Sequence, residues 1–185
     1  MKGYRVNINY AKALYLLAAE LRQEERVVQD MRLVGDVCRE NHLLNVTLDN
    51  PTLREARKAS IVRELFGPHV SDITLAFLVF VTRKRRAVHL RGISEAYIDL
   101  YRNNHNMVLS EVRTATEMAQ DVYEDIRHKV SDYTGKEVEI EKVLDRNMLG
   151  GVCITFDNNM YDARLRTKVD RLRKEFSRNV YEKRL

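Results

Sequence analysis

The sequence contains few of the residues that break helices or cross-link chains. Its 185 residues include 2 Pro, 7 Gly and 2 Cys. The two cysteines, Cys38 and Cys153, stand far apart and cannot frame a disulfide scaffold. No apolar run approaches the roughly 20 residues that a membrane-spanning helix needs, and the first residues lack the apolar core of a signal peptide. We therefore expect a helix-rich protein of a reducing compartment, either cytosolic or peripheral to a membrane.

The sequence also lacks the familiar motifs of catalysis and metal binding. Its 5 histidines are scattered, with no HExxH and no Cys/His pairs at zinc spacing. The pair Gly150-Gly151 begins an apolar strand without a following Gly-Lys-Ser/Thr, so we interpret it as a bulge or close backbone contact rather than a phosphate loop. These patterns indicate no enzyme, cofactor or metal ion. An enzyme that uses an unrecognised site in the second half stays an alternative.

The net charge of +5 is unevenly distributed. Residues 1–105 carry 17 basic and 12 acidic side chains, whereas residues 164–185 carry 9 basic and 3 acidic ones. Such a distribution indicates acidic partners, which include nucleic acid, lipid headgroups and proteins. No aromatic residue interrupts the basic run Arg83–Arg86, and we interpret the run as a solvated helix C-terminus. A basic nucleic-acid-binding adaptor is the alternative that this charge leaves open.

Apolar residues in the first half recur at helical spacing. The pattern predicts helices over residues 9–23, 25–41, 52–66, 71–86 and 86–104. Thr52 is a candidate N-cap, as is Ser71 or Asp72, and Gly67-Pro68 is a stop signal. In the first helix one apolar face is expected to contain Tyr10, Ala13, Leu14, Leu17, Ala18 and Leu21. The helix over 25–41 is expected to place Val27, Met31, Val34 and Cys38 in line, and the helix over 86–104 is expected to present Leu90, Ile93, Tyr97 and Leu100.

The segment Ile73–Val81 is the most unusual part of this half, because Thr74 is its one polar residue. As a helix it is only about 13 Å long, too short to cross a bilayer. Its composition also permits a strand, but the cap and the neighbouring helices favour a helix. A helix that is apolar on every side must be covered on every side, and a bundle of about 100 residues rarely achieves this. We therefore expect an outside partner to cover part of it.

After the polar stretch 102–106 the pattern becomes mixed. Met107–Thr114 reads as a strand, and the next helix is expected to place Ala115, Ala119, Val122, Ile126 and Tyr133 on one stripe. Glu137–Leu144 alternates as a half-solvated strand does, residues 148–156 form another strand, and a hairpin turn follows at 157–159. A final helix begins at about Ala163, with Leu165, Val169, Leu172 and Phe176 on its apolar stripe. The predicted fold is a helical domain over 1–105 followed by a β-α-β-β-α domain over 106–185.

Two segments resemble one protein family. Residues 10–15 (YAKALY) are similar to the opening helix of the delta subunit of bacterial F-type ATP synthases, the counterpart of the mitochondrial oligomycin-sensitivity-conferring protein. Residues 137–172 resemble its C-terminal signature, in which Leu144-Asp145 precedes Leu149-Gly150-Gly151 and then a strand, a hairpin and a helix. The sequence departs from that family at Asp157–Asn159, where a glycine is common, and at Asp162–Arg164, which replaces Asp-Gly-Ser.

The resemblance implies a non-catalytic stator subunit of the proton-translocating synthase, without a cofactor, at the cytoplasmic face of a bacterial inner membrane. It also implies an N-terminal six-helix bundle that binds N-terminal helices of the alpha subunits in a groove between the first and fifth helices. The C-terminal domain would bind the b subunits of the peripheral stalk.

The residues that this resemblance assigns fall into two sets. The groove would draw on Tyr10, Ala13, Leu14, Leu17, Ala18, Ile73, Ala76, Phe77 and Phe80. An internal core role is the alternative for each of these residues. The basic side chains of the final helix are candidates for steering an acidic stalk end, namely Arg164, Arg166, Lys168, Arg171 and Arg173.

Overall fold

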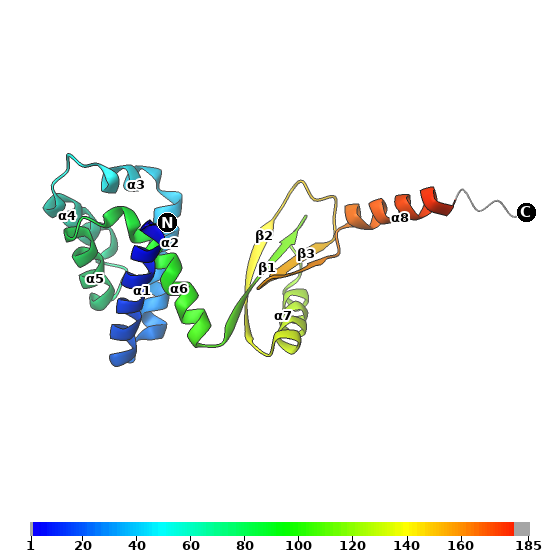
Figure 1. Cartoon of the computed structure of the whole chain (residues 1–185), viewed down its shortest axis with the longest axis horizontal. Coiled ribbons are helices and arrows are strands. Elements are labelled where there is room, and N and C mark those ends of the chain that lie inside the picture. The colour runs from blue at the N-terminus through cyan, green and yellow to red at the C-terminus, as the bar shows by residue number, and fades with distance from the viewer. Residues whose placement is uncertain (1, 180–185) are drawn as a thin grey trace, which may run out of the picture. The chain divides into compact units, whose positions relative to one another are not determined.

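The computed structural model describes residues 2–179 and divides the chain into two compact units, Met1–Asn104 and His105–Leu185. Each unit is described by itself, and Figure 1 follows the order of the elements. The first unit contains α1 (Lys2–Glu20), α2 (Glu24–Glu40), α3 (His42–Asp49), α4 (Glu55–Phe66), α5 (Asp72–Arg83), the 3-10 helix η1 (Ala87–His89) and α6 (Leu90–Asn104). The second contains β1 (Met107–Thr114), α7 (Gln120–Thr134), β2 (Glu137–Leu144), β3 (Val152–Phe156), β4 (Asn159–Asp162) and α8 (Leu165–Asn179).

The core of the first unit forms where α1 and α2 pack against α6. The predicted stripe of α2 is buried from Val27 through Met31 and Val34 to Cys38. On α6 the side chains of Leu90, Ile93 and Tyr97 are also buried. These two helices behave as their sequence period indicates, because each has one continuous apolar side that faces the other.

Helix α1 differs from its prediction because its apolar residues divide into two stripes. Ala11, Leu14 and Ala18 are buried in the unit, whereas Leu17 and Leu21 are 42% and 48% exposed. A single inward face containing all the predicted positions is therefore wrong. Helix α1 therefore has apolar residues on two sides, and its own unit covers only one of these sides.

Several helix starts in the first unit also differ from prediction, and α1 begins at Lys2 rather than near residue 9. Helix α3 was not predicted, and it begins where the Asn41 side chain accepts a hydrogen bond from the Leu44 amide at 3.0 Å. Thr52 does not cap α4, because its amide and hydroxyl both donate to the Asn50 side chain in the preceding turn. Helix α4 instead begins at Glu55, after Arg54, which makes no side-chain cap.

The second unit is built around a four-stranded sheet with the order β2-β1-β3-β4. Strands β1 and β2 are parallel, while β3 pairs antiparallel with both β1 and β4. The predicted order β-α-β-β-α lacked β4, which follows the turn after Phe156 and is only 4 residues long. Helix α7 packs on the sheet around a core of Val108, Val112, Tyr123, Ile126, Val130, Val138 and Ile154.

The predicted stripe of α7 is wrong in part. The helix begins at Gln120, so Ala115 and Ala119 precede it. Val122 and Tyr133 are 39% and 72% exposed. The side of α7 that contacts β1 and β2 is the side that is buried. It is offset from the predicted stripe by about one residue position around the helix.

The glycine pair before β3 has the structural role that the sequence predicted. Gly150 and Gly151 have φ angles of 144° and 87°, in the region that side chains rarely adopt. A Cβ on Gly151 would lie 2.4 Å from the carbonyl oxygen of Ala163. The pair is therefore a close backbone contact between the start of β3 and the segment that leads into α8.

Candidate functional site

The main candidate site is an open groove between α1 and α5 in the first unit, with a volume of about 590 Å³. Side chains spaced by three or four residues point to the same side of a helix, so each wall is a single stripe. The lining residues are Tyr10, Ala13, Leu14 and Leu17 of α1 together with Asp72, Ile73, Ala76, Phe77 and Phe80 of α5. Apart from Asp72 and the tyrosine hydroxyl, the lining is apolar. We call this feature the α1–α5 groove.

The α1–α5 groove has an aromatic contact between its walls and exposed apolar residues at its rim. Tyr10 and Phe77 meet edge to face, with ring centroids 6.4 Å apart. Leu14 is fully buried, whereas Leu17 is 42% and Phe80 48% exposed. Large apolar side chains are exposed to water here beside small residues such as Ala13. The apolar face of another helix can cover a surface of this kind.

The two ends of the groove differ in charge. Asp72 lies in the first turn of α5, and Lys84 follows the last turn with its Nζ 5.5 Å from the centroid of the Phe80 ring. Among the lining residues that the structure describes, Asp72 and Tyr10 are the ionisable ones. The groove therefore offers apolar area along its length and opposite charges at its ends.

The structure brings together eight of the nine groove residues expected from the sequence. The exception is Ala18, which is buried and does not line the groove, whereas the equally buried Leu14 does. Placing Ala18 in the groove was therefore wrong. The expectation that Ile73–Val81 is only partly covered is confirmed, since Leu78 and Val81 are fully buried while Phe80 is half exposed.

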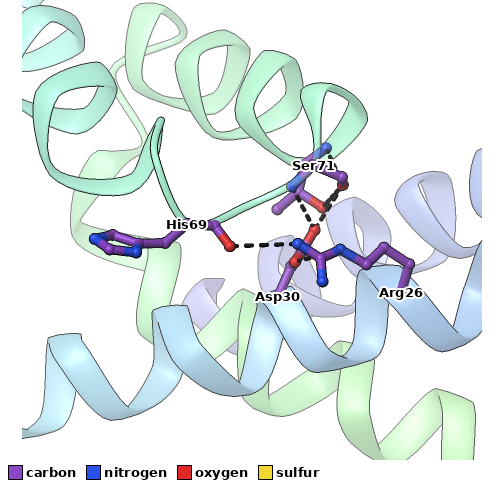
Figure 2. A network of polar contacts seen from close by, with 5 residues as sticks. Arg26, Asp30, His69 and Ser71 are labelled. Atoms are coloured by element: carbon purple, nitrogen blue, oxygen red, sulfur yellow. Dashed lines mark hydrogen bonds and ion pairs between the residues drawn. The ribbon is translucent and has the colours of Figure 1, made fainter.

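A buried carboxylate holds the start of α5. Asp30 of α2 is 3% exposed, and its Oδ2 accepts hydrogen bonds from the Ser71 amide at 2.9 Å and the Ser71 hydroxyl at 2.6 Å. Ser71, one of the two predicted cap candidates, is the N-cap of α5, and its Oγ accepts a hydrogen bond from the Thr74 amide at 3.4 Å. Arg26 lies alongside, 3.4 Å from Asp30 Oδ1, and donates to the carbonyl oxygen of His69 at 3.5 Å (Figure 2).

The basic run Arg83–Arg86 lies at the C-terminal end of α5 and is exposed along its whole length. Lys84 is the C-cap of the helix, and Arg85 follows with a positive φ of 59°. Cations at this end complement the partial negative charge of the helix dipole. The geometry is that of a solvated helix end.

In the second unit, the basic side chains of α8 fall into two groups. Arg164 precedes the helix and makes hydrogen bonds to both carboxylate oxygens of Asp162, at 2.9 and 2.6 Å. The Arg164 side chain, and then its backbone amide, hold the pKa of Asp162 well below its usual range. Arg166, Lys168, Arg171 and Arg173 are exposed, and Arg171 forms a helical ion pair with Glu175 at 3.5 Å. Residues 180–185 of the predicted basic tail lie outside the described residues.

The apolar stripe of α8 is open to solvent. Leu165, Val169, Leu172 and Phe176 are between 47% and 71% exposed. A stripe of this size on a single helix normally packs against another surface.

The sequence did not predict a second apolar groove, which lies between α7 and the β3–β4 half of the sheet. It has a volume of about 660 Å³ and is lined by Met118, Val122, Ile126, Lys129, Val130, Tyr133, Val152, Ile154, Phe156, Asn159, Met160 and Tyr161. We call it the α7–sheet groove. It arises because α7 packs mainly over β2 and covers the β3–β4 half of the sheet only in part. The exposed side chain of Tyr133 indicates the groove. Its ring lies edge to face with that of Phe156, with the ring centroids 5.8 Å apart.

Neither unit shows the elements of a metal centre or a membrane span in the described part of the chain. Between residues 2 and 179, no three or more His, Cys, Asp or Glu side chains lie where they could share a metal ion. Over the same residues, every helix is too short or too polar to traverse a bilayer. What the fold and grooves define is a two-unit protein, one unit α and the other α+β, with apolar surface open in both.

Comparison with known proteins agrees with this architecture. The family model described as "ATP synthase delta (OSCP) subunit" matches residues 6–176. The ATP synthase subunit delta of Carboxydothermus hydrogenoformans is 30% identical over 94% of this chain and 98% of its own length. That of Synechococcus elongatus is 33% identical over 88% and 91%. A chain in the cryo-EM structure of the Toxoplasma gondii mitochondrial ATP synthase hexamer shares the fold, with a TM-score of 0.69 at 16% identity over 92% of this chain and 97% of its own.

The chain therefore belongs to the ATP synthase delta (OSCP) subunit family. It is a non-catalytic, peripheral subunit of the membrane-bound F-type ATP synthase.

Proposed function

We propose that this subunit is a stator component that joins the catalytic head of the synthase to the peripheral stalk at the cytoplasmic face of a bacterial inner membrane. When the rotor turns inside the head, a stator prevents the head from turning with it. In this proposal the first unit binds N-terminal helices of the alpha subunits, and the second unit binds the b subunits. The protein transmits the opposing torque and carries out no chemistry.

The α1–α5 groove is the observation that carries the proposal. The stretch from Tyr10 to Leu17 on α1 and from Asp72 to Phe80 on α5 is long enough for about two turns of a bound helix. The exposed Leu17 and Phe80 at the rim, with Ala13 and Ala76 between them, suit an amphipathic helix whose apolar face enters the groove.

Apolar anchoring also suits a protein that must hold under load. Exposed ion pairs contribute only about 0–1 kcal/mol each, whereas buried aromatic and aliphatic anchors dominate the energy of most interfaces. Differences in affinity between related complexes arise mainly from the dissociation rate. A groove lined by Phe77, Phe80 and Leu17 therefore favours slow release of the head.

The second unit supports attachment to the stalk through its open apolar surface and the basic face of α8. Arg166, Lys168, Arg171 and Arg173 are exposed and can steer an acidic stalk end, whereas Arg164 is already held by Asp162. Steering acts on the association rate and weakens with salt. Stalk binding should therefore associate more slowly at high salt while dissociation, set by the apolar stripe, changes little. An association rate that does not respond to salt would remove the steering role.

The head-binding part is tested by calorimetric titration of the purified chain with a synthetic peptide from the N-terminus of its own synthase's alpha subunit. We expect the wild-type protein to bind and Phe77→Asp to lose binding, because the substitution puts a charge at the aromatic contact with Tyr10. Phe77→Leu keeps an apolar wall and should bind. Thermal melts establish that each variant is folded. A folded Phe77→Asp variant that binds like the wild type would refute the assignment of the groove.

A further inference from the structure

The two walls of the α1–α5 groove are supported by different parts of the first unit. Helix α1 packs mainly against α6, whereas α5 packs mainly against α4. Across the groove the walls meet at the edge-to-face contact of Tyr10 with Phe77. The width of the groove therefore depends on whatever fixes α5 relative to the half of the unit that contains α1, α2 and α6.

Asp30 and Ser71 make such a connection. Asp30 belongs to α2, which packs against α6, and Ser71 immediately precedes the groove residues Asp72 and Ile73. The Asp30 carboxylate accepts two hydrogen bonds from Ser71, at 2.9 and 2.6 Å, and Figure 2 shows the two side chains pointing toward each other. Because Asp30 is 3% exposed, solvent competes little for these bonds.

Two hydrogen bonds restrain the connection between Asp30 and Ser71 more than a single one would. A single carboxylate oxygen holds both the backbone and the side chain of Ser71, so the first turn of α5 cannot rotate or slide without breaking a bond. Ser71 in turn caps α5 through the Thr74 amide. Arg26 contacts both Asp30 and the His69 carbonyl, which lies two residues before the cap.

We propose that Asp30 is a positioning residue for the α1–α5 groove, which it acts on through Ser71. It fixes the first turn of α5 against α2, and so holds the two walls at the separation that a bound helix needs. Without it, α5 samples several positions, only some of which accept a partner, and the apparent affinity falls with the competent fraction. The peptide part of the test below rests on the proposed function, whereas the statement about groove geometry does not.

The first measurement needs no partner. Spin labels on Ala13→Cys and Ala76→Cys, one on each wall, report the distance across the groove by pulsed electron paramagnetic resonance. The native Cys38 and Cys153 are buried and protected from the label. We expect one narrow distance distribution in the wild-type background and a broader one with Asp30→Ala, which removes the oxygen that accepts both Ser71 hydrogen bonds. Ser71→Ala should broaden it less, because the Ser71 amide still donates to Asp30, and Ser71→Thr, which keeps the hydroxyl, should leave it narrow.

The second measurement is the alpha-subunit peptide titration with unlabelled protein. Asp30→Ala is expected to raise the Kd roughly threefold to tenfold while the protein stays folded. The matched control is Asp36→Ala on the same helix, where the carboxylate is 58% exposed and pairs with Arg39. It should change neither the distance distribution nor the Kd.

The outcomes separate the two proposals. A distribution for Asp30→Ala as narrow as that of the wild type overturns the positioning role, whatever the peptide does. If the distribution broadens but the wild-type protein binds no alpha-subunit peptide, the positioning role stands and the head-binding function fails. If Asp30→Ala does not fold, Ser71→Ala is compared with Ser71→Thr by the same distance measurement, and equal distributions for those two overturn the positioning role.

Discussion

Replacing Phe80 by Asp should remove most partner affinity, and the size of the effect can be worked from the structure. A phenylalanine side chain buries about 200 Å² when fully covered. Since 48% of Phe80 is exposed, a partner can cover about 100 Å² more. At about 25 cal/mol per Å² this is worth about 2.5 kcal/mol, or close to 70-fold in Kd. Interfaces rarely recover the whole of such area, so we expect a loss of about 10-fold or more.

The assay is calorimetric titration with the alpha-subunit peptide, accompanied by urea unfolding. Leu16→Asp is the matched control, because Leu16 is 69% exposed on α1 but does not line the groove. Leu16→Asp should unfold within about 0.5 kcal/mol of the wild type, as exposed substitutions usually do. Phe80→Asp should cost about 1–2 kcal/mol of stability, because half of the Phe80 side chain is already covered and an acid in the last turn of α5 opposes the helix dipole. Equal affinities for the two variants would refute the reasoning, since the groove would then contribute no more than any other exposed apolar residue.

Four further predictions concern the second unit, the cysteines and the basic run. Gly151→Ala should destabilise the protein in urea by about 1–3 kcal/mol, because its φ is 87° and the new Cβ would lie 2.4 Å from a carbonyl oxygen. Gly135→Ala, at φ 66° with open space, should cost only about 1 kcal/mol. Because the pKa of Asp162 is lowered in the folded protein, its ionised carboxylate stabilises the fold fully above the unfolded pKa of about 3.9, and this stabilisation is lost as the pH falls further. Asp162→Asn should therefore lower the free energy of unfolding at pH 7. The variant should also lose less stability than the wild type on acidification. Burial raises the pKa of the Cys38 thiol to about 11, so a Cys153→Ala variant should react with a thiol reagent at pH 8 only as fast as it unfolds. Replacing Arg83–Arg86 by glutamine should leave elution from heparin at physiological salt nearly unchanged if the run only completes a helix end; a large shift would favour nucleic-acid binding instead.

The sequence predicted best where burial repeats along a single element. The stripe of α2 is buried as predicted, and so is that of α6 apart from Leu100, which is half-buried, because a helix with one covered side shows its period directly. In α1 the inner stripe and the groove stripe are both apolar, so the sequence could not show that Ala18 faces inward while Leu17 faces out. The inner stripe is distinguished from the groove stripe only by its contact with α6, which the sequence of α1 does not show.

The features that the sequence missed are short or depend on distant parts of the chain. Helix α3 has 8 residues and strand β4 has 4, too few to show a period. The Asp30–Ser71 contact joins residues 41 positions apart and leaves no local pattern. The α7–sheet groove depends on which strands α7 covers, and this follows from the strand order rather than from the helix itself.

The strand order also bears on how the protein avoids joining to copies of itself. β2 is an edge of the sheet, and an open edge can pair with the same edge of another molecule. Glu137, Glu139 and Glu141 alternate along it, on the side of the sheet opposite α7. A second copy laid against this edge would bring like charges into register, which opposes pairing. The same strand that completes the sheet therefore discourages the molecule from growing into a chain of sheets.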